Sequence, residues 1–271
     1  MHPAHSVPAP GEVPKPQTQN ATLPICLAAI VLFAIAASLT VYYARAMAGG
    51  MKMPGGWTMS MMWMMGHGPL AALAFIGVWA IMMVAMMLPS TLPMLLLYRR
   101  VILFRGEGAA GGKIFLTGAG YFAVWAAFGA AAYFAGTAVT RAAMVSVRIS
   151  HLVPLATGVA LMIAAAYQLT PVKSTCLRHC RDPLSFAAGH FSAGWRGALN
   201  LGIHHGAFCA ACCWGLMLIQ LALGVMSLPV MTAVAVLIAL EKLAPRGELL
   251  AKVIGTAAMA AGIVLVIRAV H

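Results

Sequence analysis

The stretch PLAALAFIGVWAIMMVAMMLPSTLPMLLLY, residues 69–98, contains no charged residue. A helix of about 20 apolar residues is long enough to cross the hydrocarbon core of a membrane. Because lipid offers the backbone no hydrogen-bond partners, a chain inside the bilayer must satisfy its own peptide groups, and a helix does so. The stretch therefore predicts a transmembrane helix.

Six further apolar runs accompany this stretch. They cover approximately residues 23–44, 113–140, 151–170, 197–225, 228–243 and 249–270. Of the 271 residues, 62% are hydrophobic and 8% are charged, whereas a soluble domain has about 25% charged residues. We therefore expect an all-α fold, a polytopic transmembrane helix bundle of about seven membrane segments, or six if the short run 228–243 is re-entrant.

The chain divides into two parts by composition. Residues 1–22 are rich in proline, alanine, histidine and glutamine, so we interpret them as a disordered N-terminal tail. Residues 23–271 are predicted to form a single transmembrane helical domain. A loop at 45–68 lies between its first two membrane segments.

Most basic residues lie in alternate loops. The formal net charge is +12, and Lys and Arg gather at 99–113, 173–196 and 242–252. Because cytoplasmic loops are enriched in Lys and Arg, we predict a multi-pass protein with a cytoplasmic N-terminus. The same pattern favours the lipid bilayer and its anionic headgroups as a partner, and argues against nucleic acid.

Methionine is concentrated in and after the 45–68 loop, which this topology places outside. Eight of the twenty methionines lie between Met47 and Met65, and Met83, Met87 and Met94 follow at helical spacing in the next segment. Thioether sulfur is a soft ligand that selects Cu(I). The alternative is apolar packing, in the loop and on the helix alike. Pro89 and Pro93 are expected to interrupt that helix and to free backbone carbonyls.

Cysteine and histidine form the sharpest pattern. One group is Cys176, His179 and Cys180, and a second, on the fifth apolar run, is His205, Cys209, Cys212 and Cys213. The second group falls on one helix face, and helices joined by a short loop usually pack together. We predict that the two groups meet in one thiolate and imidazole site, suited to Cu(I) or alternatively Zn(II). Thiol–disulfide chemistry and simple apolar packing of the cysteines are the alternatives.

The charged residues suggest no hydrolytic chemistry. Only five acidic residues are present, and no phosphate-binding loop, nucleophile elbow or zinc-protease motif occurs, so we expect the protein not to be an enzyme. Glu241 could pair with Lys173 or Arg178 from another helix. The simpler interpretation is that Lys173 and Glu241 are interfacial anchors.

These motifs resemble a bacterial family of predicted metal-binding integral membrane proteins of otherwise unknown function. The resemblance extends over about residues 69–268. It is carried by MMVAMMLPS (82–90), YQLTPVKSTCLRHCRDP (167–183), CAACCWGLM (209–217) and Glu241-Lys242. It implies a protein of the bacterial inner membrane with a role in copper handling and no assigned reaction. Ala211 departs from the glycine expected there.

Together these features lead to two hypotheses of function. In the first, Cu(I) meets the external methionines, passes along Met83, Met87 and Met94, and is held by the cysteines. The protein would then transport copper or deliver it to a copper enzyme, exchanging the ion with a metal donor or acceptor protein. In the second, the clustered cysteines make the chain a membrane thiol–disulfide oxidoreductase.

Overall fold

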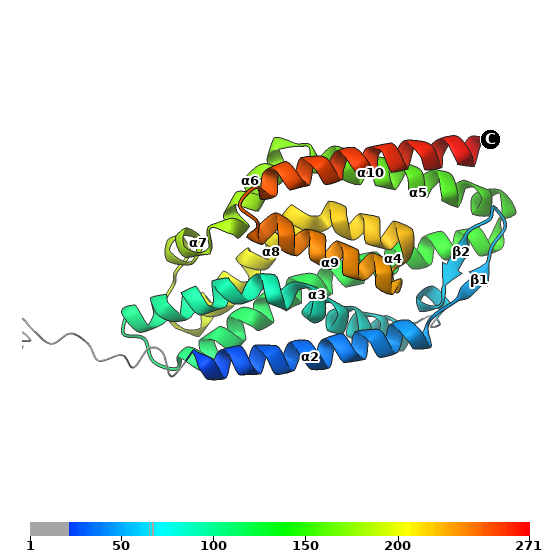
Figure 1. Ribbon diagram of the computed structural model, residues 1–271. Helices are drawn as coiled ribbons and strands as arrows, with labels where there is room; N and C mark the ends of the chain where they lie inside the picture. The colour runs from blue at the N-terminus through cyan, green and yellow to red at the C-terminus, as the bar shows by residue number, and fades with distance from the viewer. Residues whose placement is uncertain (1–21, 65, 67) are drawn as a thin grey trace, which may run out of the picture.

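A computed structural model describes residues 22–64, 66 and 68–271, so all but Thr22 of the predicted N-terminal tail lies outside the described residues. In this part of the chain, helices dominate and one short hairpin accompanies them (Figure 1). The elements are α2 (Leu23–Ala46), β1 (Gly50–Lys52), β2 (Thr58–Ser60), η1 (Met61–Met64), α3 (Pro69–Phe104), α4 (Ala110–Val145), α5 (Val147–Gln168), α6 (Pro171–Arg181), α7 (Pro183–Gly189), α8 (Gly194–Gly224), α9 (Leu228–Leu243) and α10 (Gly247–Val270).

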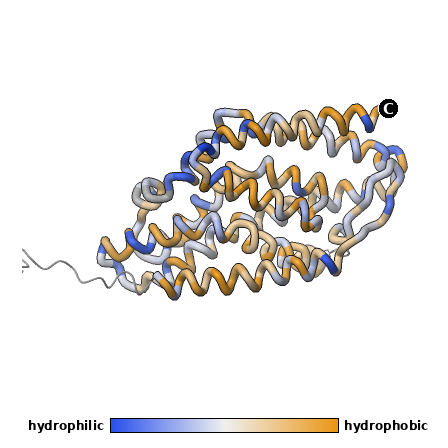
Figure 2. The backbone as a smooth tube through the Cα atoms, viewed as in Figure 1, coloured by the Kyte–Doolittle hydropathy of each residue, from blue (hydrophilic) through white to orange (hydrophobic). Residues whose placement is uncertain are grey.

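Six helices of the described chain are long and apolar enough to cross a membrane: α2, α3, α4, α5, α8 and α10. Large apolar side chains such as Leu73, Phe115 and Val253 are exposed on them, as expected of a surface that faces lipid. Figure 2 shows hydrophobic residues along these helices and hydrophilic residues gathered mainly toward their ends. The predicted all-α polytopic bundle is therefore confirmed.

The short apolar run predicted at 228–243, the sixth in chain order, is α9, which has 16 residues. A helix of that length extends about 24 Å, which is shorter than the roughly 30 Å hydrocarbon core. The α8–α9 turn also stops short of the end of the bundle where the hairpin and the C-terminus lie (Figure 1). Both observations distinguish α9 from the six longer helices, although α9 still carries the chain from the side of the hairpin back to the end of the bundle where α10 begins.

Glycines allow α4 and α8 to approach closely. A Cβ atom on Gly202 would lie 2.0 Å from the carbonyl oxygen of Thr117, and one on Gly120 would lie 2.7 Å from that of Leu199. The Thr117 hydroxyl donates a hydrogen bond across the same contact to the Ala198 carbonyl, at 2.9 Å. Small residues at such contacts are the usual means of packing helices in lipid.

We expect Gly202→Ala to lower the free energy of unfolding by about 1–3 kcal/mol, because the added methyl group meets backbone and forces α4 and α8 apart. Gly77→Ala is the matched control, since nothing lies within 4 Å of that position in α3 and alanine favours helix by about 1 kcal/mol. Denaturant unfolding of both variants in detergent measures the difference. Equal stability of the two variants would contradict this account of the α4–α8 contact.

The methionine-rich loop predicted at 45–68 contains a short β-hairpin, followed by the 3-10 helix η1. β1 and β2 pair antiparallel, with Met51 opposite Met59. The Trp57 indole donates to the Ser150 carbonyl at 3.0 Å, which fixes the hairpin to the start of α5. Met53, Met59 and Met62 are buried, whereas Met51, Met61 and Met64 are about 40% exposed. Met65 lies outside the described residues.

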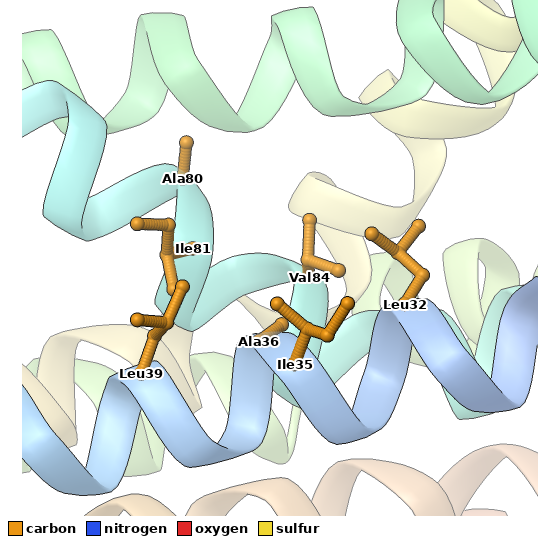
Figure 3. A pocket seen from close by; sticks show the side chains of 7 residues that line it. All are labelled: Leu32, Ile35, Ala36, Leu39, Ala80, Ile81 and Val84. Atoms are coloured by element: carbon orange, nitrogen blue, oxygen red, sulfur yellow. The ribbon is translucent and has the colours of Figure 1, made fainter.

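Helix α3 runs without interruption through Pro89 and Pro93, so the expected break is wrong. The hydroxyl groups of Ser90 and Thr91 donate to the Met87 carbonyl at 3.0 and 2.9 Å. Between α2 and α3 lies a hollow lined entirely by apolar side chains, including Ile35 and Val84 (Figure 3). This hollow carries no ligand chemistry.

Candidate metal centre

The short helix α6 has a defined N-terminal cap and packs one of its faces against the bundle. Thr170 caps it, since its hydroxyl accepts a hydrogen bond from the Lys173 amide at 3.2 Å, and Pro171 occupies the first helical turn, where its missing N–H costs nothing. Lys173, Cys176 and Cys180 then repeat at intervals of three and four residues, so they share a face. Lys173 is buried, and both cysteines are half-buried against the main core.

Helix α8 supplies the opposite wall. The face predicted from its spacing is the buried one. It consists of His205, Cys209, Cys212, Cys213 and Met217. None of these five side chains is more than 4% exposed. The close approach of α8 to α4, described above, helps to keep this face inside the bundle.

The two cysteine groups meet, as the sequence predicts. The sulfur atoms of Cys180 and Cys212 lie 3.6 Å apart, and Cys212 also interacts with Cys209 and Cys213. All six cysteines are free thiols. Two sulfurs that each bind one ion at about 2.3 Å can lie up to roughly 4.6 Å apart, so one ion fits between Cys180 and Cys212.

Cys209 is held by two polar partners from other helices. The Lys242 ammonium lies 2.9 Å from its sulfur, and the Tyr121 hydroxyl group lies 2.9 Å away as well. Lys242 also reaches the Ser90 hydroxyl at 3.4 Å. Side chains from α3, α4 and α9 therefore surround the α8 thiol.

A second buried cation neighbours the cysteines. Lys173 donates to Glu241 at 2.6 Å and also contacts the Cys212 carbonyl. Glu241 in turn accepts a bond from Gln168 at 2.8 Å. Lys173 and Glu241 are no more than 1% exposed, so the predicted pairing between them is confirmed and the interfacial-anchor interpretation is wrong.

The thiols of α6 are shifted toward their protonated form. The hydrogen bond with Cys212, together with burial, holds the pKa of the Cys180 thiol well above its usual range. Burial likewise raises the pKa of the Cys176 thiol. Because only a thiolate binds metal, an arriving soft ion must displace these protons, and binding is coupled to proton release.

Some predicted ligands lie elsewhere. Met83 and Met87 share the main core with the α8 cysteines, but Met94 belongs to a separate core around Tyr98 and Ile102. His179 is exposed and stacks on Phe208, with ring centroids 4.8 Å apart. Among the described residues, no three His, Cys, Asp or Glu side chains are already arranged as a complete metal site.

Sequence reasoning missed Tyr121 and Lys242 as contacts of the site. Tyr121 lies within an ordinary apolar run, and nothing in its sequence neighbourhood distinguishes it. Lys242 was assigned to a basic loop, whereas the structure leaves it only 8% exposed. A lysine directly after an acidic residue at the end of an apolar run is the signal that could have indicated a buried role.

Comparison with protein-family models identifies a family for this chain. The family model of PpoB2, a copper chaperone, matches residues 76–265. No curated protein and no solved structure matches the chain significantly. The matched region contains both cysteine groups, the α3 methionines and the Lys173–Glu241 pair, and it agrees with the family resemblance seen in the sequence. Since the match covers most of the chain, this protein belongs to the PpoB2 family of copper chaperones.

Proposed function

We propose that the protein is a membrane copper chaperone that holds Cu(I) between cysteine thiolates of α6 and α8, without catalysing a reaction. The observation that carries this proposal is the Cys180–Cys212 pair, whose sulfur atoms lie 3.6 Å apart where α6 packs against the sulfur-rich main core. Thiolates are the strongest soft ligands that a protein can offer to Cu(I). Cys209 and Cys213 interact with Cys212, and Cys176 packs against the same core.

Cu(I) suits the Cys180–Cys212 pair better than Zn(II) does. Structural zinc sites are almost always closed, four-coordinate and tetrahedral, whereas the described residues offer one close sulfur pair with further thiols engaged in other bonds. A close pair of soft thiolate ligands is of the kind that selects Cu(I). Zn(II) therefore remains the second choice for this site.

Methionines provide a route for the ion toward the thiols. Met51, Met61 and Met64 are exposed at the hairpin end, and Met83 and Met87 lie in the core that also holds Cys209, Cys212 and Cys213. Thioethers bind soft ions without deprotonation, so they suit transient contact, while thiolates suit retention. Met94, in the separate core, is not part of this route.

The orientation follows from charge. The end of the bundle opposite the hairpin is rich in arginine: Arg100 lies near the end of α3 and Arg105 directly follows it, Arg178 lies in α6, and Arg196 lies in the first turn of α8. By the positive-inside rule this end faces the cytoplasm of a bacterial inner membrane, and the hairpin faces outward. The thiol cluster, joined to α6, then lies nearer the cytoplasmic side. There it could exchange copper with a soluble donor or acceptor protein.

Copper binding by a cysteine variant tests the proposal. Full-length protein in detergent is loaded anaerobically with Cu(I), treated with a competing Cu(I) chelator, and analysed for retained copper per chain. We expect Cys209→Ser, Cys212→Ser and Cys213→Ser combined to lose the chelator-resistant copper. Cys26→Ser, in the outer helix α2, is the matched control and should retain it. A triple variant that keeps the wild-type amount would refute the proposal.

The Cys180–Cys212 pair also supports the alternative function, because sulfur atoms 3.6 Å apart need only a small movement to form a disulfide of about 2.05 Å. Alkylation of the thiols before and after reduction separates the two functions. Metal-protected reduced thiols favour the chaperone. A reversible disulfide in the active protein favours the oxidoreductase.

A further inference from the structure

Three imidazoles lie against the aromatic pair of Phe186 and Phe208 at the α6–α7 end of the bundle, and a fourth lies beside one of them. His190 stacks on Phe186 with ring centroids 4.4 Å apart, and His179 stacks on Phe208 at 4.8 Å. His205 lies 5.3 Å from Phe186. His190 and His204 are neighbours, with centroids 5.7 Å apart. These histidines come from α6, α8 and the end of α7, so the fold gathers them from separate parts of the chain.

A surface hollow opens at this cluster. Its lining includes His179, Phe186 and His190, together with Arg178, Arg181 and Asp182. His179, His190 and His204 are exposed, whereas His205 is only 4% exposed. Because His204 and His205 are consecutive on α8, they point to different sides of that helix. The imidazoles thus extend from the surface to the buried face that continues to Cys209.

The hydrogen bonds of these histidines leave nitrogen lone pairs available. The Nδ1 atoms of His190 and His179 lie 3.1 and 2.9 Å from the carbonyl oxygens of Phe186 and Thr175. A carbonyl oxygen only accepts, so each Nδ1 carries the proton and each Nε2 is free to bind metal. This backbone-fixed arrangement is the one usual for metal-binding histidine.

The buried His205 adds an independent observation. Its Nδ1 atom has no hydrogen-bond partner among the described residues, although buried polar atoms normally have one. Its ring lies 5.5 Å from that of Tyr121, which bonds Cys209. An imidazole nitrogen left free between the hollow and the thiols is placed to contact an ion that moves between them.

We propose that His190 and His204 form a second Cu(I) site at this hollow, through which the ion is exchanged by way of His205 with the thiols of α8. Imidazole nitrogens bind such ions at about 2 Å, so two rings with centroids 5.7 Å apart can hold one ion between them. The exchange with the thiols rests on the proposed function, because it requires the cysteines of α6 and α8 to hold copper.

The exchange is a ligand substitution without redox change. The two Cu–N bonds break as Cu–S bonds form, copper stays Cu(I), and the displaced thiol protons leave through the hollow to water. Imidazole is a harder ligand than thiolate, so the surface site binds more weakly. A weaker outer site releases its ion readily to either side, as exchange requires.

Competition with a chromogenic Cu(I) chelator tests this second site in the full-length protein. We expect wild type to bind a chelator-resistant fraction and a second, weaker equivalent of Cu(I). His190→Ala combined with His204→Ala should lose the weaker equivalent, keep the resistant fraction, and exchange copper with the chelator at least tenfold more slowly. His151→Ala is the matched control, because His151 is exposed at the hairpin end, and it should behave as wild type.

The outcomes separate the inference from the proposed function. A double variant that keeps the weaker equivalent and exchanges copper within twofold of the wild-type rate would overturn the second site. If the double variant unfolds, His204→Ala alone, at an exposed position, replaces it, and it should likewise lose the weaker equivalent of Cu(I). The variant with serine at Cys209, Cys212 and Cys213 should still bind the weaker equivalent, so loss of thiolate copper leaves the imidazole site measurable.

Discussion

Replacing Glu241 by alanine is expected to lower the free energy of unfolding by about 3–5 kcal/mol, because it leaves the Lys173 ammonium buried without its counter-ion. Glu241 and Lys173 are 2.6 Å apart, and neither is more than 1% exposed. Gln168 loses its bond to the carboxylate in the same substitution. The surrounding helices α5, α6, α8 and α9 all contribute to this network, so water cannot easily replace the lost partner.

Denaturant unfolding in detergent measures this effect, and two variants control it. Glu248→Ala removes a less buried carboxylate near the start of α10, where a charge contributes about 0.3–1 kcal/mol. Glu241→Ala combined with Lys173→Met removes both charges and should recover much of the loss, because replacing both members of a buried pair is often nearly neutral. A loss below 1 kcal/mol for Glu241→Ala alone would show that Lys173 is not held as a buried cation.

The sequence predicts the helices and the meeting of the cysteine groups because both follow from local rules. Apolar runs long enough for a membrane must be helical, and spacing alone assigns His205, Cys209, Cys212 and Cys213 to one face. Thr170 and Pro171 explain why α6 begins as a new helix after α5. The segment 182–193, which contains α7, then returns the chain from α6 to α8 and brings Cys180 to Cys212.

Other features depend on tertiary packing that no local pattern records. Met83, Met87 and Met94 share a spacing, yet Met94 enters a different core because α7 packs against the far part of α3. The hairpin is held in place by the hydrogen bond from the Trp57 indole to the carbonyl of Ser150, which lies 93 residues away in the sequence. The position of Lys242, at the end of an apolar run and before a polar turn, is compatible with either a solvated or a buried side chain. The packing of α9 decides between the two.

Lys242 is expected to set the copper affinity of the site. A Cu(I) ion bound by two thiolates carries one net negative charge. Lys173 is paired with Glu241, whereas within the described residues Lys242 has no carboxylate in salt-bridge range and contacts Cys209 instead. Two unit charges about 4 Å apart interact by roughly 4 kcal/mol at an effective dielectric constant of 20. The Lys242 ammonium therefore balances the charge of the copper–thiolate complex.

We expect Lys242→Leu to weaken Cu(I) binding by about 10–100-fold, the effect usual for partners that tune a metal ligand, without lowering the stability of the metal-free protein. In the metal-free state Cys209 can remain a neutral thiol. Removal of the buried Lys242 ammonium then leaves no buried negative charge without a partner. Chelator competition gives the affinity and denaturant unfolding gives the stability. Lys242→Arg, which keeps the charge, should bind more tightly than Lys242→Leu, and Lys252→Leu, at an exposed position on α10, should match wild type. If Lys242→Leu binds copper as wild type does, the charge of the complex is balanced by another group.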